Sequence, residues 1–289
     1  MPELNYFEPI VFLKIGGEYA MNIENPVSLN EKLQWLQKYV MKGNSKYDIR
    51  YKLPGKEYVG KVLGEEYVAK VFDIYTSPDD INWDTLPNHF VIKREFGGGG
   101  EGVIVVRDKN SMDKITTINQ IRDWIANPQT GLDWLIRHDI NRVFVEEYIE
   151  GAGGENLDYK VYCFNGRARL LLVSYKSSTN NAMSSTGSLF SFYTIQGNGG
   201  GWIQAPFTRP GHGLCDSPLP KKLTQMVELS EKIASEGFPF MRVDWYESGD
   251  RIIVGELTPY SACGFALFDP LEWDYTLGSW LTLPSKQVK

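Results

Sequence analysis

Three things are scarce in this sequence, and each scarcity excludes a class of protein. The 289 residues include three cysteines, and Cys163, Cys215 and Cys263 lie too far apart for a metal site or a disulfide framework. No apolar run approaches the roughly 20 residues that span a bilayer. Basic residues are not in excess: the net charge is -6, which argues against a general nucleic-acid binder.

The first residues of the sequence also lack the pattern of a signal peptide. Residues 1–15 have neither the basic beginning nor the long apolar core of a signal peptide. We therefore expect a cytoplasmic protein without a membrane span and without a nucleic-acid partner. The sequence does not indicate an oligomeric state.

The chain is long enough for a large core, and its 42% hydrophobic and 23% charged residues are ordinary for a globular protein. The first ninety residues are predicted to be mostly helical, because Leu33, Leu36 and Val40 recur at helical spacing. After Phe90 strands and helices mix without a regular βαβ order, which predicts a mixed α/β (α+β) fold.

The pattern after residue 90 predicts three hairpins, two helices and a long loop. The Asn165-Gly166 pair is the strongest hairpin signal among them. The predicted strands are 90–93 with 103–106, 142–145, 158–164 with 167–175, and 240–246 with 251–257; the helices are 112–126 and 219–234, and 177–201 is predicted to be loop.

The glycine-rich segment between the first two of these strands has two common interpretations that its context excludes. Gly97, Gly99 and Gly102 satisfy G-x-G-x-x-G, but a strand follows where a dinucleotide-binding fold needs a helix. No Gly-Lys-Ser/Thr follows, so the segment is not a P-loop. It is either a flap whose backbone N–H groups close over phosphates, with Lys93 reaching the same phosphates, or a flexible surface turn beside a solvated lysine.

The last hairpin carries the candidate metal ligands. Arg242 and Asp244 share one face of their strand. A three-residue turn at 248–250 would make Asp244 and Glu256 diagonal neighbours on that face, whereas a four-residue turn would put them on opposite faces. On one face, the two carboxylates suit magnesium and the guanidinium suits phosphate. The alternative is an exposed surface salt bridge.

Three further features are weaker. Asp158 and Lys160 share one face of the Asn165-Gly166 hairpin, where they could bind ribose and phosphate or be solvated. Residues 146–149 leave a strand and could present backbone groups to adenine, or form an ordinary exit from the strand. Residues 177–216 are expected on the substrate side, with Lys176 facing phosphate.

In this order the segments resemble the ATP-grasp family, and specifically its TupA-like (teichuronopeptide-biosynthesis-like) branch, over roughly residues 26–262. The segments that carry the resemblance are Asn30 to Trp35, Leu86 to Lys93, Asp158 to Gly166, Arg242 to Tyr246, and Gly255 to Thr258.

The resemblance implies two α+β subdomains that clamp a nucleotide, preceded by a helical N-terminal region. The expected segments are 1–89 for that region, 90–176 for a lid subdomain with the glycine flap, and 177–289 for a subdomain with the metal-binding hairpin. It implies ATP and two Mg²⁺ ions, which Mn²⁺ could replace.

It also implies roles for single residues. Residues 146–149 are similar to the linker that contacts adenine, Asp158 to the ribose-binding acid, and Arg242 to the arginine near the γ-phosphate. The implied ATP-binding residues are Lys93, Gly98, Gly99, Gly100, Glu146, Glu147, Tyr148, Ile149, Asp158, Lys160 and Lys176; the catalytic residues are Arg242 and Lys160, and the metal ligands are Asp244, Glu256 and Thr258.

Two positions depart from the pattern of the family. Thr258 stands where many ATP-grasp enzymes have asparagine, and its neutral oxygen is a weaker metal ligand. Tyr51-Lys52 stands where this branch often has Asp-Lys, so Lys52 is a further candidate for a phosphate contact.

The resemblance implies a ligase that activates a carboxylate as an acyl phosphate and joins it to an amine or another nucleophile. The expected substrates are a cell-surface polysaccharide or peptide precursor, or a peptide-like metabolite. The alternatives are a kinase that phosphorylates a sugar or glycan hydroxyl, and a nucleotide-binding module without catalysis. No Asp-x-Asp motif of a nucleotide-sugar site is present.

Overall fold

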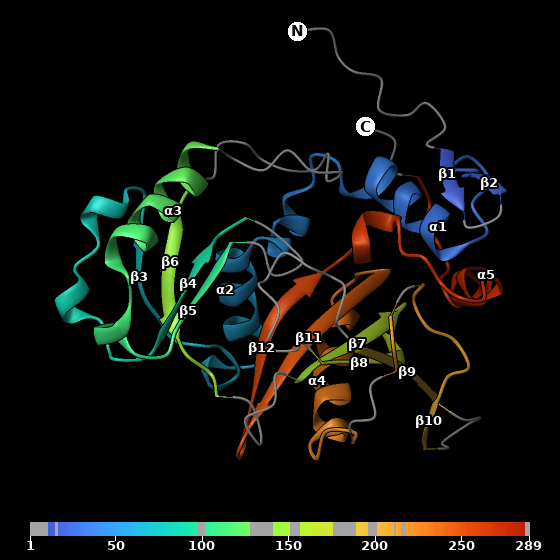
Figure 1. The fold of residues 1–289 in the computed structure, drawn as a ribbon. Coiled ribbons are helices and arrows are strands. Elements are labelled where there is room, and N and C mark those ends of the chain that lie inside the picture. Colours follow the sequence, from blue (N-terminus) through green and yellow to red (C-terminus); the bar gives the residue numbers. More distant parts are fainter. Residues whose placement is uncertain are drawn as a thin grey trace, which may run out of the picture.

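Two antiparallel sheets form the body of the chain in its computed structural model, and they lie in two lobes with helix α2 (Lys52–Val62) between them (Figure 1). The mixed α/β class expected from the sequence is confirmed. The structure describes residues 11–14, 17–96, 102–127, 141–150, 157–175, 189–195, 201–210, 212–214 and 218–286, with side chains from residue 21 onward.

The smaller sheet has the strand order β3–β6–β4–β5. One face is apolar and packs on helix α3, where Phe90, Ile92, Ile121 and Val143 are fully buried. The opposite face carries Lys93 and Glu146 and looks toward α2. The elements are β3 (Val71–Tyr75), β4 (Phe90–Arg94), β5 (Val103–Val106), β6 (Val143–Glu147) and α3 (Lys114–Ala126).

The larger sheet has the order β10–β9–β8–β7–β11–β12. Helix α4 covers one face, and the indole N–H of Trp245 on β11 donates to Ser230 Oγ on α4 at 2.9 Å. The elements are β7 (Leu157–Phe164), β8 (Arg167–Tyr175), β9 (Leu189–Ile195), β10 (Trp202–Gln204), β11 (Phe240–Ser248), β12 (Arg251–Thr258) and α4 (Leu223–Ser235).

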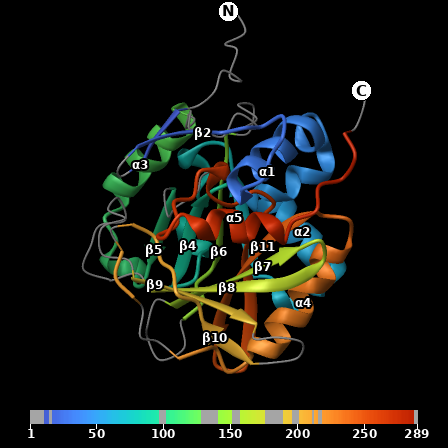
Figure 2. The same ribbon diagram turned by 90° about the vertical axis from the view of Figure 1, so that its right-hand side faces the viewer.

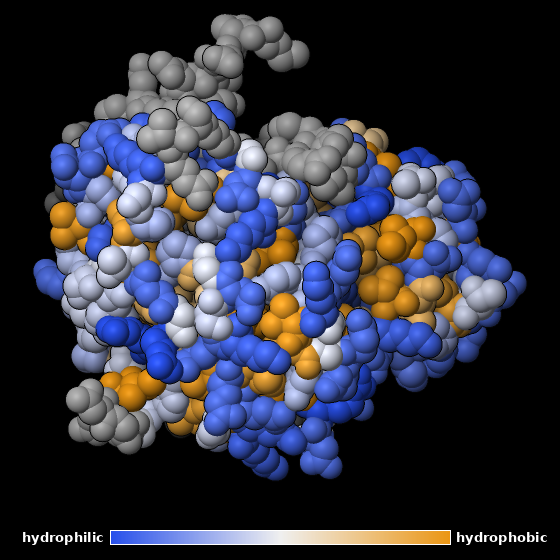
Figure 3. Space-filling view, turned by 180° about the vertical axis from the view of Figure 1, so that it is seen from behind, coloured by the Kyte–Doolittle hydropathy of each residue, from blue (hydrophilic) through white to orange (hydrophobic). Residues whose placement is uncertain are grey.

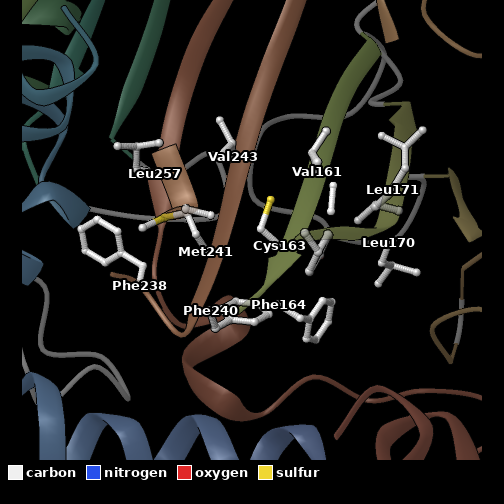
Figure 4. Packing of buried hydrophobic residues seen from close by; sticks show 14 of the residues in the cluster. Val161, Cys163, Phe164, Leu170, Leu171, Phe238, Phe240, Met241, Val243 and Leu257 are labelled. Carbon is white, nitrogen blue, oxygen red and sulfur yellow. The ribbon is translucent and has the colours of Figure 1, made fainter. Parts of the chain in front are cut away.

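The main core lies on the α4 side of this sheet (Figure 4). Val161, Cys163, Met241 and Val243 lie at alternate positions of their strands and are 0% exposed, so a period of two sends them all to one face. Burial also raises the pKa of the Cys163 thiol. This cysteine is therefore a packing residue.

Helices from both ends of the chain pack together at the edge of this lobe (Figure 2). A capping box between Ser28 and Glu31 begins α1. Asn30 on α1 then bonds both carboxylate oxygens of Asp274 on α5, at 3.0 and 2.9 Å. The remaining elements are β1 (Val11–Lys14), β2 (Gly17–Ala20), α1 (Leu29–Leu36), α5 (Glu272–Ser279), a π-helix at Gln37–Met41, and short 3₁₀ helices at Ser45–Arg50, Glu65–Tyr67, Pro78–Asp80, Trp83–Thr85, Lys109–Ser111 and Ser261–Gly264.

Two expectations from the sequence are corrected. Residues 189–195, expected within the 177–201 loop, form strand β9, because the run Leu-Phe-Ser-Phe-Tyr-Thr-Ile pairs with β8 along its length. The N-terminal ninety residues contain strands as well as helices, and their β3 completes the smaller sheet. The larger sheet takes β7 and β8 from the expected 90–176 segment. The sheets thus do not follow the expected segment boundaries, and a division into domains stays a prediction.

The surface gives no sign of a broad apolar face on the side seen in Figure 3. Hydrophobic residues lie there in small patches separated by hydrophilic ones. Among the helices that the structure describes, none combines the length and the apolar character needed to cross a membrane.

The contact between α1 and α5 yields a test of the fold. A Cβ added at Gly278 would lie 2.2 Å from the Val27 oxygen and 2.7 Å from the Leu29 nitrogen. Because both atoms belong to the backbone, Gly278→Ala forces the helices apart and should destabilise the protein by about 1–3 kcal/mol in urea unfolding. Gly201→Ala is the control, since nothing lies within 4 Å of its added Cβ. Equal stability of the two variants would contradict this packing.

Candidate functional site

The β11–β12 hairpin places Asp244 directly opposite Glu256. Neither the three-residue nor the four-residue turn considered from the sequence is present: Ser248 pairs with Arg251 across a two-residue turn, Gly249 and Asp250. That turn alone would put the two carboxylates on opposite faces. An irregularity between Asp244 and Trp245, which leaves Gly255 without a partner in the register, shifts the pairing by one residue and returns Glu256 to the face of Asp244.

Steric crowding explains why position 255 is occupied by glycine. A Cβ there would lie 2.5 Å from Cε2 of Tyr246, so the ring of Tyr246 rests against bare backbone at the bulge. The bulge and the ring position therefore depend on the same missing side chain.

Four residues of the hairpin, Arg242, Asp244, Glu256 and Thr258, form a bonded group that we name the acidic hairpin. Arg242 donates to both oxygens of Asp244, at 2.6 and 2.8 Å, and to Glu256 Oε1 at 3.3 Å. The Thr258 hydroxyl donates to the same Glu256 oxygen at 2.7 Å. Beyond the hairpin, Arg242 Nη1 lies 3.3 Å from Ser261 Oγ, a contact with no signal in the sequence.

Strand β7 adds Lys160 and Asp158 beside the acidic hairpin. Lys160 Nζ lies 2.6 Å from Asp244 Oδ2 and also pairs with Asp158. Burial raises the pKa of the Asp244 carboxyl, but Arg242 and Lys160 outweigh it, and the pKa falls below its ordinary value. Burial lowers the pKa of Lys160, and Asp158 and Asp244 more than reverse this. Asp244 and Lys160 are therefore both charged at neutral pH.

The other Asp158 oxygen is an open acceptor. Its Oδ1 is buried and accepts no hydrogen bond from the residues that the structure describes. A buried carboxylate oxygen without a donor is costly, so a ligand hydroxyl at this position would complete the bonding of the carboxylate. This is the position expected to hold ribose.

The smaller lobe faces this group with three lysines around Glu146, which we name the lysine cluster. Lys93 Nζ lies 2.5 Å from Glu146 Oε1, and Lys56 Nζ lies 2.7 Å from Oε2. Burial raises the pKa of Glu146, and the two lysines bring it below its ordinary value. Lys52, the third member, precedes Lys56 by one helical turn on α2. The sequence analysis missed Lys56, although its i, i+4 spacing from Lys52 on a helix was visible.

One pocket between α2 and β12 is lined by members of both the lysine cluster and the acidic hairpin. Lys52, Lys56 and Glu256 line it together. Burial lowers the pKa of Lys52 to about 8, the charge of Glu256 opposes this shift, and the charge of Lys93 adds to it. Lys52 thus lies within electrostatic reach of both groups, and positive and negative walls face each other.

The expected adenine linker begins in the last residues of β6. Glu147 is fixed by its backbone N–H to the Lys70 oxygen at 2.8 Å and by its carboxylate to Arg251 Nη1 at 2.6 Å, which ties the smaller lobe to β12. Tyr148 and Ile149 follow as half-buried residues. The expected ligands Gly98, Gly99, Gly100 and Lys176 lie outside the described residues.

The residues fit a magnesium ion that arrives with phosphate oxygens. Among the described residues no cluster of three or more His, Cys, Asp or Glu side chains could cage a metal alone. Asp244 and Glu256 face one another, the Glu256 side chain is 35% exposed, and the Thr258 hydroxyl lies beside it. One or two carboxylates completed by phosphates are the usual protein contribution to a nucleotide-bound magnesium.

Comparison with known protein families shows which family the chain belongs to. A family model described as TupA-like ATP-grasp matches residues 31–282, which is most of the chain. The fold, with its two lobes around a charged pocket, is thus an ATP-grasp fold. The chain belongs to the TupA-like ATP-grasp family, as the resemblance implied.

Solved structures similar to the chain include ligases of low identity. They are D-alanine–D-alanine ligase from Bacillus anthracis (16% identity, 73% of this chain and 57% of that one, TM-score 0.44), N5-carboxyaminoimidazole synthetase from Staphylococcus aureus complexed with ADP (14%, 82% and 53%, 0.43) and D-alanine–D-alanine ligase from Helicobacter pylori (14%, 94% and 77%, 0.43). The chain thus spans between half and three fifths of the first two. No curated protein matches it.

The position of Lys52 generates a prediction on proton uptake. At pH 8 a group with a pKa of about 8 is half protonated, and a bound phosphate favours the charged ammonium and raises the pKa. Binding of Mg·ADP should therefore take up about half a proton at pH 8 and almost none at pH 6. Calorimetry in two buffers of different ionisation enthalpy measures this number.

The matched variant is Lys52→Arg. It keeps the positive charge but does not titrate in this range, so binding should persist while the uptake at pH 8 disappears. The same uptake in both proteins would show that Lys52 does not contact the phosphates.

Proposed function

We propose that the chain is an ATP-dependent ligase that activates a carboxylate as an acyl phosphate and joins it to an amine or another nucleophile. The observation that carries the proposal is the meeting of two oppositely charged groups, since Glu256 of the acidic hairpin lines one pocket with Lys52 and Lys56 of the lysine cluster. Family membership supports the same reaction class.

The nucleotide is proposed to lie along the pocket from the linker to the acidic hairpin. Backbone groups of Tyr148 and Ile149 contact adenine, and the open oxygen of Asp158 accepts a ribose hydroxyl. The lysine cluster then holds the phosphates, since two of its ammonium groups, those of Lys56 and Lys93, share the single carboxylate of Glu146.

The chemistry needs charge stabilisation more than a nucleophilic side chain. A substrate carboxylate oxygen forms a bond to the γ-phosphorus, the bond from that phosphorus to the β-phosphate oxygen breaks, and ADP leaves. Arg242 and Lys160 stabilise the negative charge on the transferred group. Bound magnesium neutralises phosphate charge. An amine then attacks the acyl carbon, loses a proton, and inorganic phosphate leaves.

The substrates are proposed from the family alone. They are a carboxylate donor and an amine acceptor on a cell-surface polysaccharide or peptide precursor, or on a peptide-like metabolite. We place the reaction in the cytoplasm, where ATP is supplied.

An ADP-release screen over pairs of carboxylates and amines tests the function. We expect ADP and inorganic phosphate when both substrates are present, with a product that mass analysis shows to be free of phosphate. Phosphate retained on a hydroxyl would instead establish a kinase, and tight nucleotide binding without turnover in any combination would contradict an enzyme.

Asp244→Asn connects this activity to the acidic hairpin. Removal of the carboxylate charge should lower kcat by about 100-fold or more, while Asp250→Asn in the exposed turn of the same hairpin should leave it unchanged. An Asp244→Asn protein with the kcat of the wild type would remove the proposed metal site.

Thr258→Asn tests the second magnesium ion. An amide oxygen is a better ligand for this cation than a hydroxyl beside Glu256, so the variant should reach half-maximal activity at a lower magnesium concentration. The titration is repeated with manganese. An unchanged midpoint with both metals would mean that residue 258 does not contact the ion.

A further inference from the structure

A turn with three successive left-handed residues follows the acidic hairpin. Ala262, Cys263 and Gly264 have φ angles of 49°, 54° and 74°, and we name Ser261–Gly264 the left-handed turn. This region suits glycine, whereas alanine and cysteine enter it at a steric cost. Strain of this kind persists where the surroundings fix the backbone.

Helix α1 and the π-helix that continues it fix this backbone. Gln34 Nε2 donates to the Cys263 oxygen at 2.5 Å, and Gln37 Nε2 donates to the same oxygen at 3.1 Å. Gln34 also fills the space beside Gly264, where an added Cβ would lie 2.9 Å from its Nε2. The centre of the turn is thus held from one side by two carboxamides.

A third carboxamide on the same helical face holds the end of the segment. Asn30 Nδ2 donates to the Ala266 oxygen at 2.7 Å, and Asn30 Oδ1 accepts from the Ala266 N–H at 2.9 Å. Asp274 on α5 orients Asn30 in turn. Residues 30, 34 and 37 recur at helical spacing, so one stripe of the helix is directed at residues 263–266.

Packing alone does not explain this stripe. Asn30, Gln34 and Gln37 are 6%, 4% and 0% exposed, and apolar side chains of similar size would fill the same space without burying amide groups. Unlike apolar side chains, the three carboxamides make directional hydrogen bonds, and each bond fixes the orientation of one carbonyl or N–H group of the segment.

The segment that they fix contacts the catalytic arginine. Ser261, the first residue of the left-handed turn, lies with its Oγ 3.3 Å from Arg242 Nη1. A displacement of the turn therefore moves a partner of the guanidinium that also holds Asp244 and Glu256.

We propose that Gln34 and Gln37 are positioning residues, which keep the left-handed turn in its strained conformation and so keep Ser261 against Arg242. The inference rests on the proposed ligase function for its kinetic part. It assigns the N-terminal helical region a role in the active site in addition to its role in stability.

Gln34→Met removes the donor and keeps the length of the side chain. The protein should fold, its KM for ATP should change little, and its kcat for ADP release should fall by about tenfold or more. In a background with Ala262→Gly and Cys263→Gly the turn is free of its steric cost, so the same Gln34→Met change should lower kcat by less than about threefold. Gln120→Met, on an exposed position of α3, is the control.

Amide hydrogen exchange is the second readout and needs no substrate. Gln34→Met should speed exchange in residues 258–266 and leave β7 and α4 unchanged. An equal loss of kcat in both backgrounds, an unchanged kcat, or faster exchange across the whole chain would overturn the positioning role. If the wild type releases no ADP with any pair of substrates, the proposed function fails, and the exchange pattern alone then decides whether the glutamines hold the turn.

Discussion

The site depends on one local constraint, the register of the β11–β12 hairpin. A strand sends successive side chains to opposite faces, so a slip of one residue would separate Asp244 from Glu256. The bulge at Gly255 corrects the parity set by the two-residue turn, and it can form because position 255 has no side chain to meet the ring of Tyr246. The proposed binding of a metal ion between Asp244 and Glu256 therefore depends on Gly255, a residue whose side chain takes no part in the binding.

Charge is separated between the two walls of the pocket. On the larger sheet Lys160 and Arg242 face three carboxylates, Asp158, Asp244 and Glu256, whereas Lys93 of the smaller sheet and Lys56 of α2 share Glu146. Buried charges are costly unless they are paired, and the ion pairs keep each wall stable without ligand. Negative charge remains in excess on the acidic wall and positive charge on the lysine wall. The acidic wall therefore suits a cation, and the lysine wall suits phosphates. Such preorganised charge avoids reorganisation during phosphoryl transfer.

The sequence was informative wherever a local pattern decides the structure. The hairpins around the glycine flap and at Asn165-Gly166 were predicted nearly to the residue, because turn chemistry and alternation act over short distances. The same rules placed Arg242 and Asp244 on one face. They failed at β9, whose surrounding glycine and serine residues hid an apolar strand, and at the Gly255 bulge, since no local signal distinguishes a bulge from a longer turn. Lys56 was missed because its partner Glu146 is ninety residues away.

The left-handed turn is held by long-range contacts, those of Gln34 and Gln37 with Cys263, which no sequence motif reveals. Nothing in Ser-Ala-Cys-Gly indicates three successive residues with positive φ, and the residues that hold them are more than two hundred positions earlier in the chain. The match to the family model begins at residue 31, at the start of α1. A helix that only covered the core could vary in its polar positions, whereas one that fixes a strained turn beside Arg242 has to present its carboxamides at a defined spacing. The positioning role proposed for Gln34 and Gln37 therefore makes α1 and the π-helix that continues it a part of the site.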